Sequence, residues 1–199
     1  RRRAGLRISR CALLLQLGLP PAAFPADEIP PLPQINPGDF EPAMQAEVQQ
    51  AYAAARDHPG NAAFNGRLGM LMHSFQQLEF AEVCYRRAIY SAPDEFSWGY
   101  YLGLVLVLSG KHIEAATVLK SALSKQPDYL PARLRLAESL VAAGNLEESE
   151  EIYQRVLEQE PDTAEAYYGL GLIASARKKT DSASEYYRKA CDLFPNYGA

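Results

Sequence analysis

The sequence has few of the residues that carry catalytic or metal chemistry. It contains three histidines, three cysteines and one tryptophan in 199 residues. The histidines, His58, His73 and His112, form no pair at the spacing that places two ligands on one helix face. No Gly-rich phosphate loop, Gly-x-Ser-x-Gly elbow or His-Glu-x-x-His motif occurs. These absences predict a chain without catalytic residues, without metal ligands and without a cofactor.

Cysteine is too sparse to cross-link the fold. Cys11 lies near the N-terminus, while Cys84 and Cys191 are 107 residues apart, and no Cys-x-x-Cys pair exists. We therefore predict that Cys84 and Cys191 are free thiols buried in helices.

Basic residues are also scarce once the N-terminus is set aside. The chain has 20 Lys and Arg against 24 Asp and Glu, for a net charge of −4. Five of the 20 are arginines that precede the first acidic residue, Asp27, so 15 basic residues face 24 acidic ones in the remainder. This balance argues against nucleic-acid binding, which needs a basic stripe to neutralise phosphates. The acidic run 147–151 is interpreted as a solvated helix face rather than a general acid–base pair.

Residues 1–26 have the order of a secretory signal. An arginine-rich opening is followed by an apolar run over 11–19 and then by a stretch of proline and alanine, with Ala23 and Ala26 as candidate cleavage sites. The apolar run is too short to span a bilayer. This segment predicts export to the periplasm or the extracellular space. The alternative is a disordered basic tail, in which case the protein would be cytoplasmic.

Residues 27–38 (DEIPPLPQINPG) carry four prolines and no helical period. They predict an extended, polyproline-like linker that costs little ordering entropy. The alternative is that the IPPLP run docks in a groove of this chain or of a neighbour.

Prolines recur at a constant interval through the rest of the chain. Pro59, Pro93, Pro127, Pro161 and Pro195 are each 34 residues apart. No single helix or strand produces such a spacing, so one structural unit has been copied along the chain. The predicted units are 62–95, 96–129, 130–163 and 164–197.

Each unit carries the same residue types at the same positions. Two apolar-periodic segments flank a short polar turn, which predicts a pair of helices. Small residues at positions 8 and 20 let the two helices approach closely, and the larger residues at positions 7 and 24 fill the space around the contact. In the order of positions 7, 8, 20, 24 and 27, the residues are Leu68, Leu102, Leu136 and Leu170; Gly69, Gly103, Ala137 and Gly171; Ala81, Ala115, Ser149 and Ala183; Tyr85, Leu119, Tyr153 and Tyr187; and Ala88, Ala122, Val156 and Ala190.

The ends of the helices are marked as well. Gly110 and Gly144 lie where the first helix of units two and three should end, so a left-handed C-cap is predicted there. Units one and four carry Gln76 and Lys178 at the same place, which is expected to change local packing and not the fold. Each repeated proline ends a second helix, because proline cannot continue the hydrogen-bond ladder.

Residues 39–58 are predicted to form a further helix that packs on unit one as an N-terminal cap. Asp39 or Glu41 is the candidate N-cap residue, and Pro42 suits the first turn. At the other end, residues 195–199 resemble the opening of a fifth unit without a polar helix to cover the last one. Because solenoids normally need such a cap, we expect either a longer protein or self-association through the uncapped C-terminal repeat.

This pattern resembles the tetratricopeptide repeat family over residues 62–197, and all four units hold the frame without gaps. The resemblance implies an all-α fold, a right-handed α-solenoid of helix-turn-helix units that binds a protein or peptide in its concave groove. Ser149 and Val156 depart from the alanine that the family carries. Of the residues with which some family members clamp a terminal carboxylate, this chain has only Arg135, so that mode is not expected.

By the same resemblance, the first helix of each unit lines the groove. We predict an apolar and aromatic groove with tyrosine anchors, in which Arg67 and Arg135 are isolated charges. Trp98 and Tyr167 are instead expected to pack between neighbouring units. The predicted groove residues are Arg67, Met70, His73, Tyr100, Tyr101, Leu104, Arg135, Glu138, Tyr168 and Leu172.

The leading hypothesis from the sequence is a non-enzymatic interaction scaffold, whose stiff concave surface loses little entropy when a peptide docks. The alternative is the N-terminal recognition arm of a larger enzyme or cytochrome that continues past Ala199. Neither hypothesis involves nucleic acid or a membrane span in the mature chain.

Overall fold

The computed structural model describes residues 29–194, so the signal-like segment 1–26 and the last repeated proline lie outside the described residues. The described part is all-α, with one 3-10 turn, η1 (Pro37–Asp39), and nine α-helices. The helices are α2 (Pro42–Asp57), α3 (Ala62–Ser74), α4 (Leu78–Ser91), α5 (Phe96–Leu108), α6 (His112–Leu123), α7 (Leu130–Ala142), α8 (Leu146–Gln159), α9 (Ala164–Ala176) and α10 (Thr180–Leu193).

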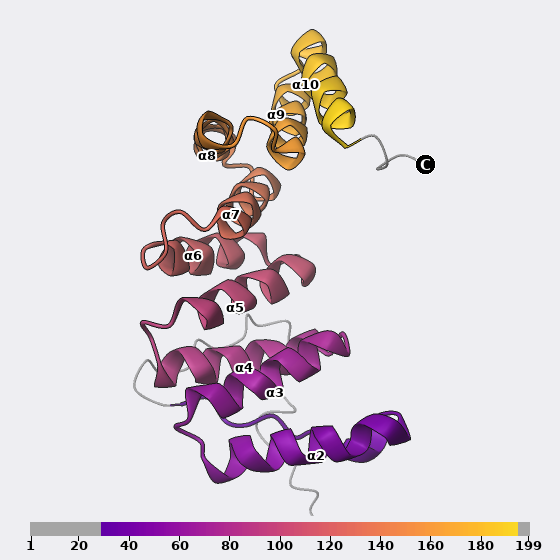
Figure 1. Ribbon diagram of the computed structural model, residues 1–199, viewed down its shortest axis with the longest axis vertical. Coiled ribbons are helices and arrows are strands. Elements are labelled where there is room, and N and C mark those ends of the chain that lie inside the picture. The colour runs from indigo at the N-terminus through magenta and orange to yellow at the C-terminus, as the bar shows by residue number, and fades with distance from the viewer. Residues whose placement is uncertain (1–28, 195–199) are drawn as a thin grey trace, which may run out of the picture.

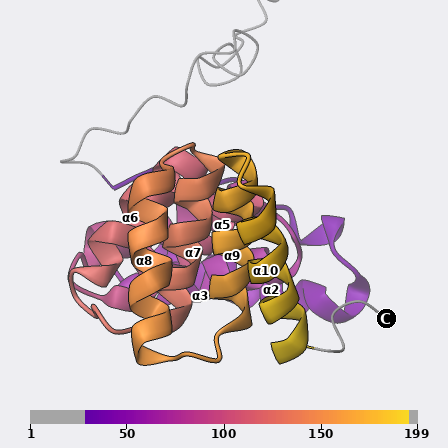
Figure 2. The same cartoon turned by 90° about the horizontal axis from the view of Figure 1, so that it is seen from above.

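The helices stack in chain order into an elongated solenoid, from α2 at one end to α10 at the other (Figure 1). Each 34-residue frame holds one helix pair, and each pair packs on the next. The backbones of the first helices α3, α5, α7 and α9 also approach one another in succession, whereas the backbones of the described second helices α4, α6, α8 and α10 lie further apart. The first helices therefore lie on the inner, concave side of the stack. Figure 2 shows the stack end-on, with α6 and α8 along one side of it.

The turns between paired helices use a left-handed residue in every unit. Gly110 has φ +71° and Gly144 has φ +82°, which confirms the predicted C-caps. Gln76 and Lys178 adopt the same conformation, at φ 59° and 61°. A residue with a Cβ is strained there by roughly 1–2 kcal/mol, so units one and four keep the turn geometry at a cost that units two and three avoid.

Small residues at the helix crossings are required by the packing. A Cβ added to Gly103 would lie 2.5 Å from Leu119 Cδ2, and one added to Gly69 would lie 2.8 Å from Tyr85 Cε1. Ser149, which departs from the alanine of the other units, is also buried, and its hydroxyl donates a hydrogen bond to the Ala137 carbonyl at 2.8 Å. The hydroxyl thus fits the crossing because it has a partner.

The start of α2 corrects one expectation. Pro42 occupies the first turn as predicted, but the N-cap Glu41 makes no side-chain capping bond. Asp39 belongs to η1, where its carboxylate accepts a hydrogen bond from Asn36 Nδ2 at 3.0 Å. Of the two predicted candidates, Glu41 occupies the N-cap position, and Asp39 is wrong because its carboxylate is engaged one turn earlier.

Residues 29–40, called the strap here, pack against the first unit instead of forming a free spacer. Pro30 and Ile35 are buried, and Leu32 and Phe40 pack against the same core cluster, which includes residues of α2, α3 and α4. The Phe40 ring lies 5.3 Å from the ring of Phe75. In Figure 1 the strap is the indigo coil that runs between α2 and the first helix pair.

A buried arginine fastens the strap. Arg87 on α4 is only 3% exposed, and its Nη1 donates a hydrogen bond to the Pro30 carbonyl. Its Nε donates to Asn65 Oδ1 at 2.7 Å. Asn65 Nδ2 in turn donates to the carbonyls of Pro59 and Asn61, both at 2.8 Å. Unit one is thus tied by one polar network to the segments on either side of α2.

The two cysteines in the described part differ from each other. Cys84 is fully buried on α4, and burial raises the pKa of its thiol to about 12, which leaves it protonated and unreactive. Cys191 is exposed on α10. The prediction that both are buried is wrong for Cys191, because no described element packs on that side of the last helix.

Candidate functional site

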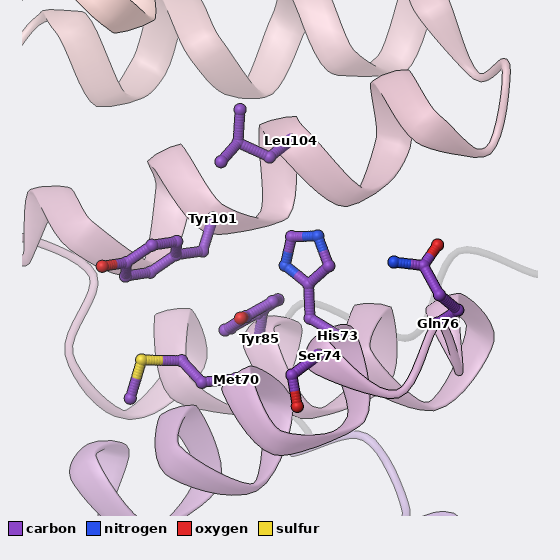
Figure 3. Close-up of a pocket in the computed structure, with 7 residues that line it drawn as sticks. All are labelled: Met70, His73, Ser74, Gln76, Tyr85, Tyr101 and Leu104. Carbon is purple, nitrogen blue, oxygen red and sulfur yellow. The ribbon is translucent and has the colours of Figure 1, made fainter.

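The concave side carries a hollow of about 370 Å³ between units one and two. Its walls come from the first helices of both units, and its floor comes from α4 (Figure 3). The volume lies at the lower end of the range for ligand pockets in proteins. The lining residues are Met70, His73 and Ser74 on α3, Gln76 in the following turn, Tyr85 on α4, and Tyr101 and Leu104 on α5.

Helical spacing explains why these residues meet. Met70, His73 and Ser74 are three and four residues apart, so they share one face of α3. Tyr101 and Leu104 share a face of α5 for the same reason. Gly69 is also required for the hollow, because the absence of a side chain there lets the Tyr85 ring lie directly against α3.

Tyr85 forms an aromatic floor under the hollow. Its side chain is 0% exposed, and its ring stacks on Tyr101 with centroids 5.7 Å apart and an interplanar angle of 19°. His73 meets the same ring edge-on at 6.4 Å and 85°. Burial raises the pKa of Tyr85 well above its usual value, so the phenol keeps its proton.

The hollow carries no charged side chain at neutral pH. Its lining includes no Lys, Arg, Asp or Glu. The one titratable group near neutrality is His73, and burial lowers its pKa below the ordinary value of 6.5, which leaves the ring neutral at pH 7. The surface therefore favours an uncharged, apolar group over an ionic one.

A second aromatic cluster lies one unit further along. The Tyr100 ring stacks on Phe96 at 5.8 Å and meets Tyr129 edge-on at 5.2 Å. Burial raises the pKa of Tyr100. Tyr100 is thus half-buried within its own cluster, with only part of its ring available on the concave side.

Arg67 and Arg135 were predicted to be isolated charges in the groove, and Arg135 is instead paired. Arg135 Nη1 lies 2.7 Å from Glu138 Oε2, three residues along α7 and therefore on the same face. The prediction of an isolated Arg135 is wrong, since the pair cancels its charge. Arg67 is exposed on α3 and does not line the hollow.

The last unit contributes surface rather than a pocket. Tyr168 is 54% exposed, with its ring 5.7 Å from that of Tyr187, and Leu172 is half-buried. Neither lies at the hollow. The ten predicted groove residues therefore spread along the concave side, and the hollow gathers four of them: Met70, His73, Tyr101 and Leu104.

The predicted packing of large aromatics between neighbouring units is confirmed for Trp98. Trp98 packs between units one and two, since a Cβ on Gly66 of α3 would lie 2.3 Å from its ring. Tyr167 meets a residue of its own unit, as Lys189 Nζ lies 5.9 Å above its ring.

The sequence did not predict that Tyr85 forms the floor of the hollow. Position 24 was expected only to fill the helix crossing, yet Tyr85 both fills the crossing and lines the hollow. The phenol gave no signal that singles out unit one, because Tyr153 and Tyr187 occupy the same position in units three and four.

Known proteins share the repeat sequence and the fold of this chain. Two family models, each described as Tetratricopeptide repeat, match residues 106–175 and 164–197. Residues 106–197 thus match the tetratricopeptide repeat family. Among curated protein sequences none matches this chain.

Solved structures share the fold. "Crystal structure of MamA" superposes with a TM-score of 0.68 at 17% identity, covering 80% of this chain and 95% of that one. A MamA fragment from Desulfovibrio magneticus RS-1 gives a TM-score of 0.70 at 17% identity, with 79% and 89% covered. YrrB, described as a TPR protein with an unusual peptide-binding site, gives 0.71 at 22% identity, with 78% and 80% covered. These identities show a common architecture.

The described residues give no sign of metal or membrane chemistry. Within 29–194 no three His, Cys, Asp or Glu side chains gather as a metal site would require. None of the helices in that range combines the length and apolar character needed to cross a bilayer. Family and fold together support a role in protein interaction.

Proposed function

We propose that this tetratricopeptide repeat protein is a non-enzymatic scaffold that binds a peptide, or a peptide-like segment of a protein, on its concave side. The observation that carries the proposal is the uncharged hollow between α3 and α5, which is bordered by half-exposed apolar side chains. Met70 is 41% exposed there without being needed for the core. Preformed apolar surface of this kind binds with little reorganisation.

The neighbouring surface supports an extended ligand rather than a small molecule. Beyond the hollow, exposed apolar side chains recur at Leu108 on α5, which is 57% exposed, and at Tyr168 on α9, which is 54% exposed, with the Arg135–Glu138 pair on α7 between them. A peptide could contact several first helices at once, each through one side chain. YrrB, which has a similar fold, is described as having a peptide-binding site, and this favours the same class of ligand here.

The proposal is tested by selecting peptides from a random displayed library on the full chain. Their affinity is then measured by fluorescence anisotropy for the wild type and for Met70→Arg. A charge placed at the rim of an apolar hollow should weaken binding at least ~10-fold, since desolvating it costs more than about 1.4 kcal/mol.

Ile113→Arg is the matched control. Ile113 is 76% exposed on α6 and does not line the hollow between units one and two, so the same substitution there should leave affinity unchanged. If no peptide is enriched, or if the enriched peptides bind Met70→Arg as tightly as wild type, the concave hollow is not the binding site.

We also propose that the protein is exported, on the strength of the arginine-rich and apolar order of residues 1–26. Expression with and without these residues, followed by cell fractionation, tests this. Equal distribution of the two forms would contradict export.

A further inference from the structure

The hydroxyl of Tyr85 has no hydrogen-bond partner. Among buried side-chain atoms of residues 29–194, only this oxygen and His112 Nδ1 lack one. Two other units carry tyrosine at the equivalent position, Tyr153 and Tyr187, and neither leaves a buried oxygen unpaired. A phenylalanine at position 85 would fill the same space without the desolvation cost of an orphaned hydroxyl. The hydroxyl therefore needs an explanation.

The unpaired oxygen belongs to a residue that lines the hollow, whose other lining residues are Met70, His73, Tyr101 and Leu104 together with the polar Ser74 and Gln76. Tyr101 and His73 present ring edges and faces, and Met70 presents a sulfur (Figure 3). Such walls suit an aromatic ring, which packs favourably edge-on or offset against other rings and against methionine sulfur. With no charge in the lining, the ring must be uncharged too.

The polar atom decides which aromatic side chain fits. The Tyr85 hydroxyl can donate one hydrogen bond and can accept others. An indole N–H only donates, so a tryptophan would leave the Tyr85 proton without an acceptor. A phenylalanine offers nothing to it. Among the aromatic side chains only a phenol and a neutral imidazole both accept and donate, and the phenol brings the larger apolar ring to the aromatic walls.

We propose that the hollow is an anchor pocket for a tyrosine side chain of the partner peptide, whose hydroxyl forms a hydrogen bond with the Tyr85 hydroxyl. This inference rests on the proposed function, because it names the side chain that the concave surface selects. Met70 is the lining group best able to give way, since it is unbranched and 41% exposed. Its displacement opens the path to the floor.

The test uses two small probes that differ by the phenol oxygen, 4-methylphenol and toluene. They correspond to the side chains of tyrosine and phenylalanine. Binding to the full chain is followed by NMR of ¹³C-methyl-labelled methionine. The sequence has three methionines, so Met70 reports on the hollow while Met44, on α2, serves as an internal reference. We expect 4-methylphenol to shift the Met70 signal and to bind ~3–10-fold more tightly than toluene.

Tyr85→Phe is the decisive variant. It should abolish the preference for 4-methylphenol while toluene still binds, and it should leave the free protein as stable as wild type or more so. Tyr153→Phe, at the equivalent position of unit three, should keep the preference. Equal binding of the two probes to wild type, a preference that survives Tyr85→Phe, or shifts at Met44 without shifts at Met70 would each overturn the proposal.

The outcomes separate this inference from the proposed function. If selected peptides lose affinity in Met70→Arg but the probes show no preference for the phenol, the surface binds peptides without a tyrosine anchor. If the phenol preference is present and depends on Tyr85 while no peptide binds, the pocket exists and the peptide scaffold does not.

Discussion

The first and last units of the solenoid have nearly the same repeat residues but differ in burial. Tyr85 in unit one is 0% exposed, whereas Tyr187 at the equivalent position in unit four is half-buried. The core cluster around unit one extends from Ile35 in the strap to Ala115 on α6. On α10 the buried residues are Ala183 and Ala190.

The difference arises from what lies on each side of a unit. Unit one is covered by α2 and the strap on one side and by α5 on the other. Unit four is covered by unit three, and no described element packs beyond α10. A repeat sequence thus fixes which residues face the helix crossing, but neighbouring elements decide how deeply those residues are buried.

The largest expected effect comes from crowding the same position in both units. Gly69→Leu forces a side chain into the fully buried Tyr85 ring and should lower the free energy of unfolding by about 3 kcal/mol. Gly171→Leu faces the half-buried Tyr187, which can swing outward, and helix propensity offsets part of the strain. We expect a loss of about 1 kcal/mol or less there, measured by urea unfolding with far-UV circular dichroism. Equal losses would show that the two ends are packed alike.

The next effect tests the strap. Arg87→Ala removes the donor to Asn65 and to Pro30 and leaves buried acceptors unpaired, which should cost about 2–3 kcal/mol. Arg155 occupies the same repeat position in unit three and is exposed. Arg155→Ala should change stability by less than about 0.5 kcal/mol. The same unfolding measurement compares them, and a small loss for Arg87→Ala would mean that the strap does not stabilise unit one.

The sequence predicted the solenoid well because the information lies in a repeated frame. Five positions of each unit indicated which residues meet at the helix crossing, and Gly110 and Gly144 marked the left-handed turns. Contacts outside the frame were not predictable in the same way. Arg87 and Asn65 lie at positions where the repeat prescribes no residue type, so their bond to the strap left no periodic signal.

The candidate site was only partly predictable for a related reason. Spacing along a helix showed that Met70 and His73 share a face, and likewise Tyr101 and Leu104. It could not show that a hollow forms between units one and two. That depends on the fully buried ring of Tyr85 and on the packing that neighbouring elements impose on it.

A smaller effect is expected at the strained turns. Lys178→Gly removes a Cβ from a residue at φ 61° and should stabilise unit four by about 1 kcal/mol, as should Gln76→Gly in unit one. The reverse change is Gly110→Gln. A Cβ at residue 110 would have no atom within 4 Å, so any loss of stability would report backbone strain alone. It should cost about 1 kcal/mol. Thermal melts of the three variants should show shifts of opposite sign, and a destabilised Lys178→Gly would contradict the strain argument.

The smallest effects concern ion pairs that join consecutive second helices. In unit one, Arg86 lies 3.0 Å from Glu82 and 2.5 Å from Glu114 of the next unit, and Glu82 also meets Lys111 at 2.8 Å. In unit two the equivalent residue, Lys120, meets Glu148 at 2.7 Å, and both side chains are more than one-third exposed.

Arg86→Met leaves the largely buried Glu82 with one cation fewer but still paired with Lys111, so we expect a loss of about 0.5–1 kcal/mol that persists in salt. Lys120→Met breaks a solvated pair and should cost less than about 0.5 kcal/mol. In 1 M NaCl the loss for Lys120→Met should vanish, because the screening length falls to about 3 Å. Urea titrations at low and high salt measure both. If the two variants lose the same stability and respond alike to salt, the linked charges of the first units are no stronger than an ordinary surface pair, and the contrast between the ends of the solenoid rests on apolar packing and the strap alone.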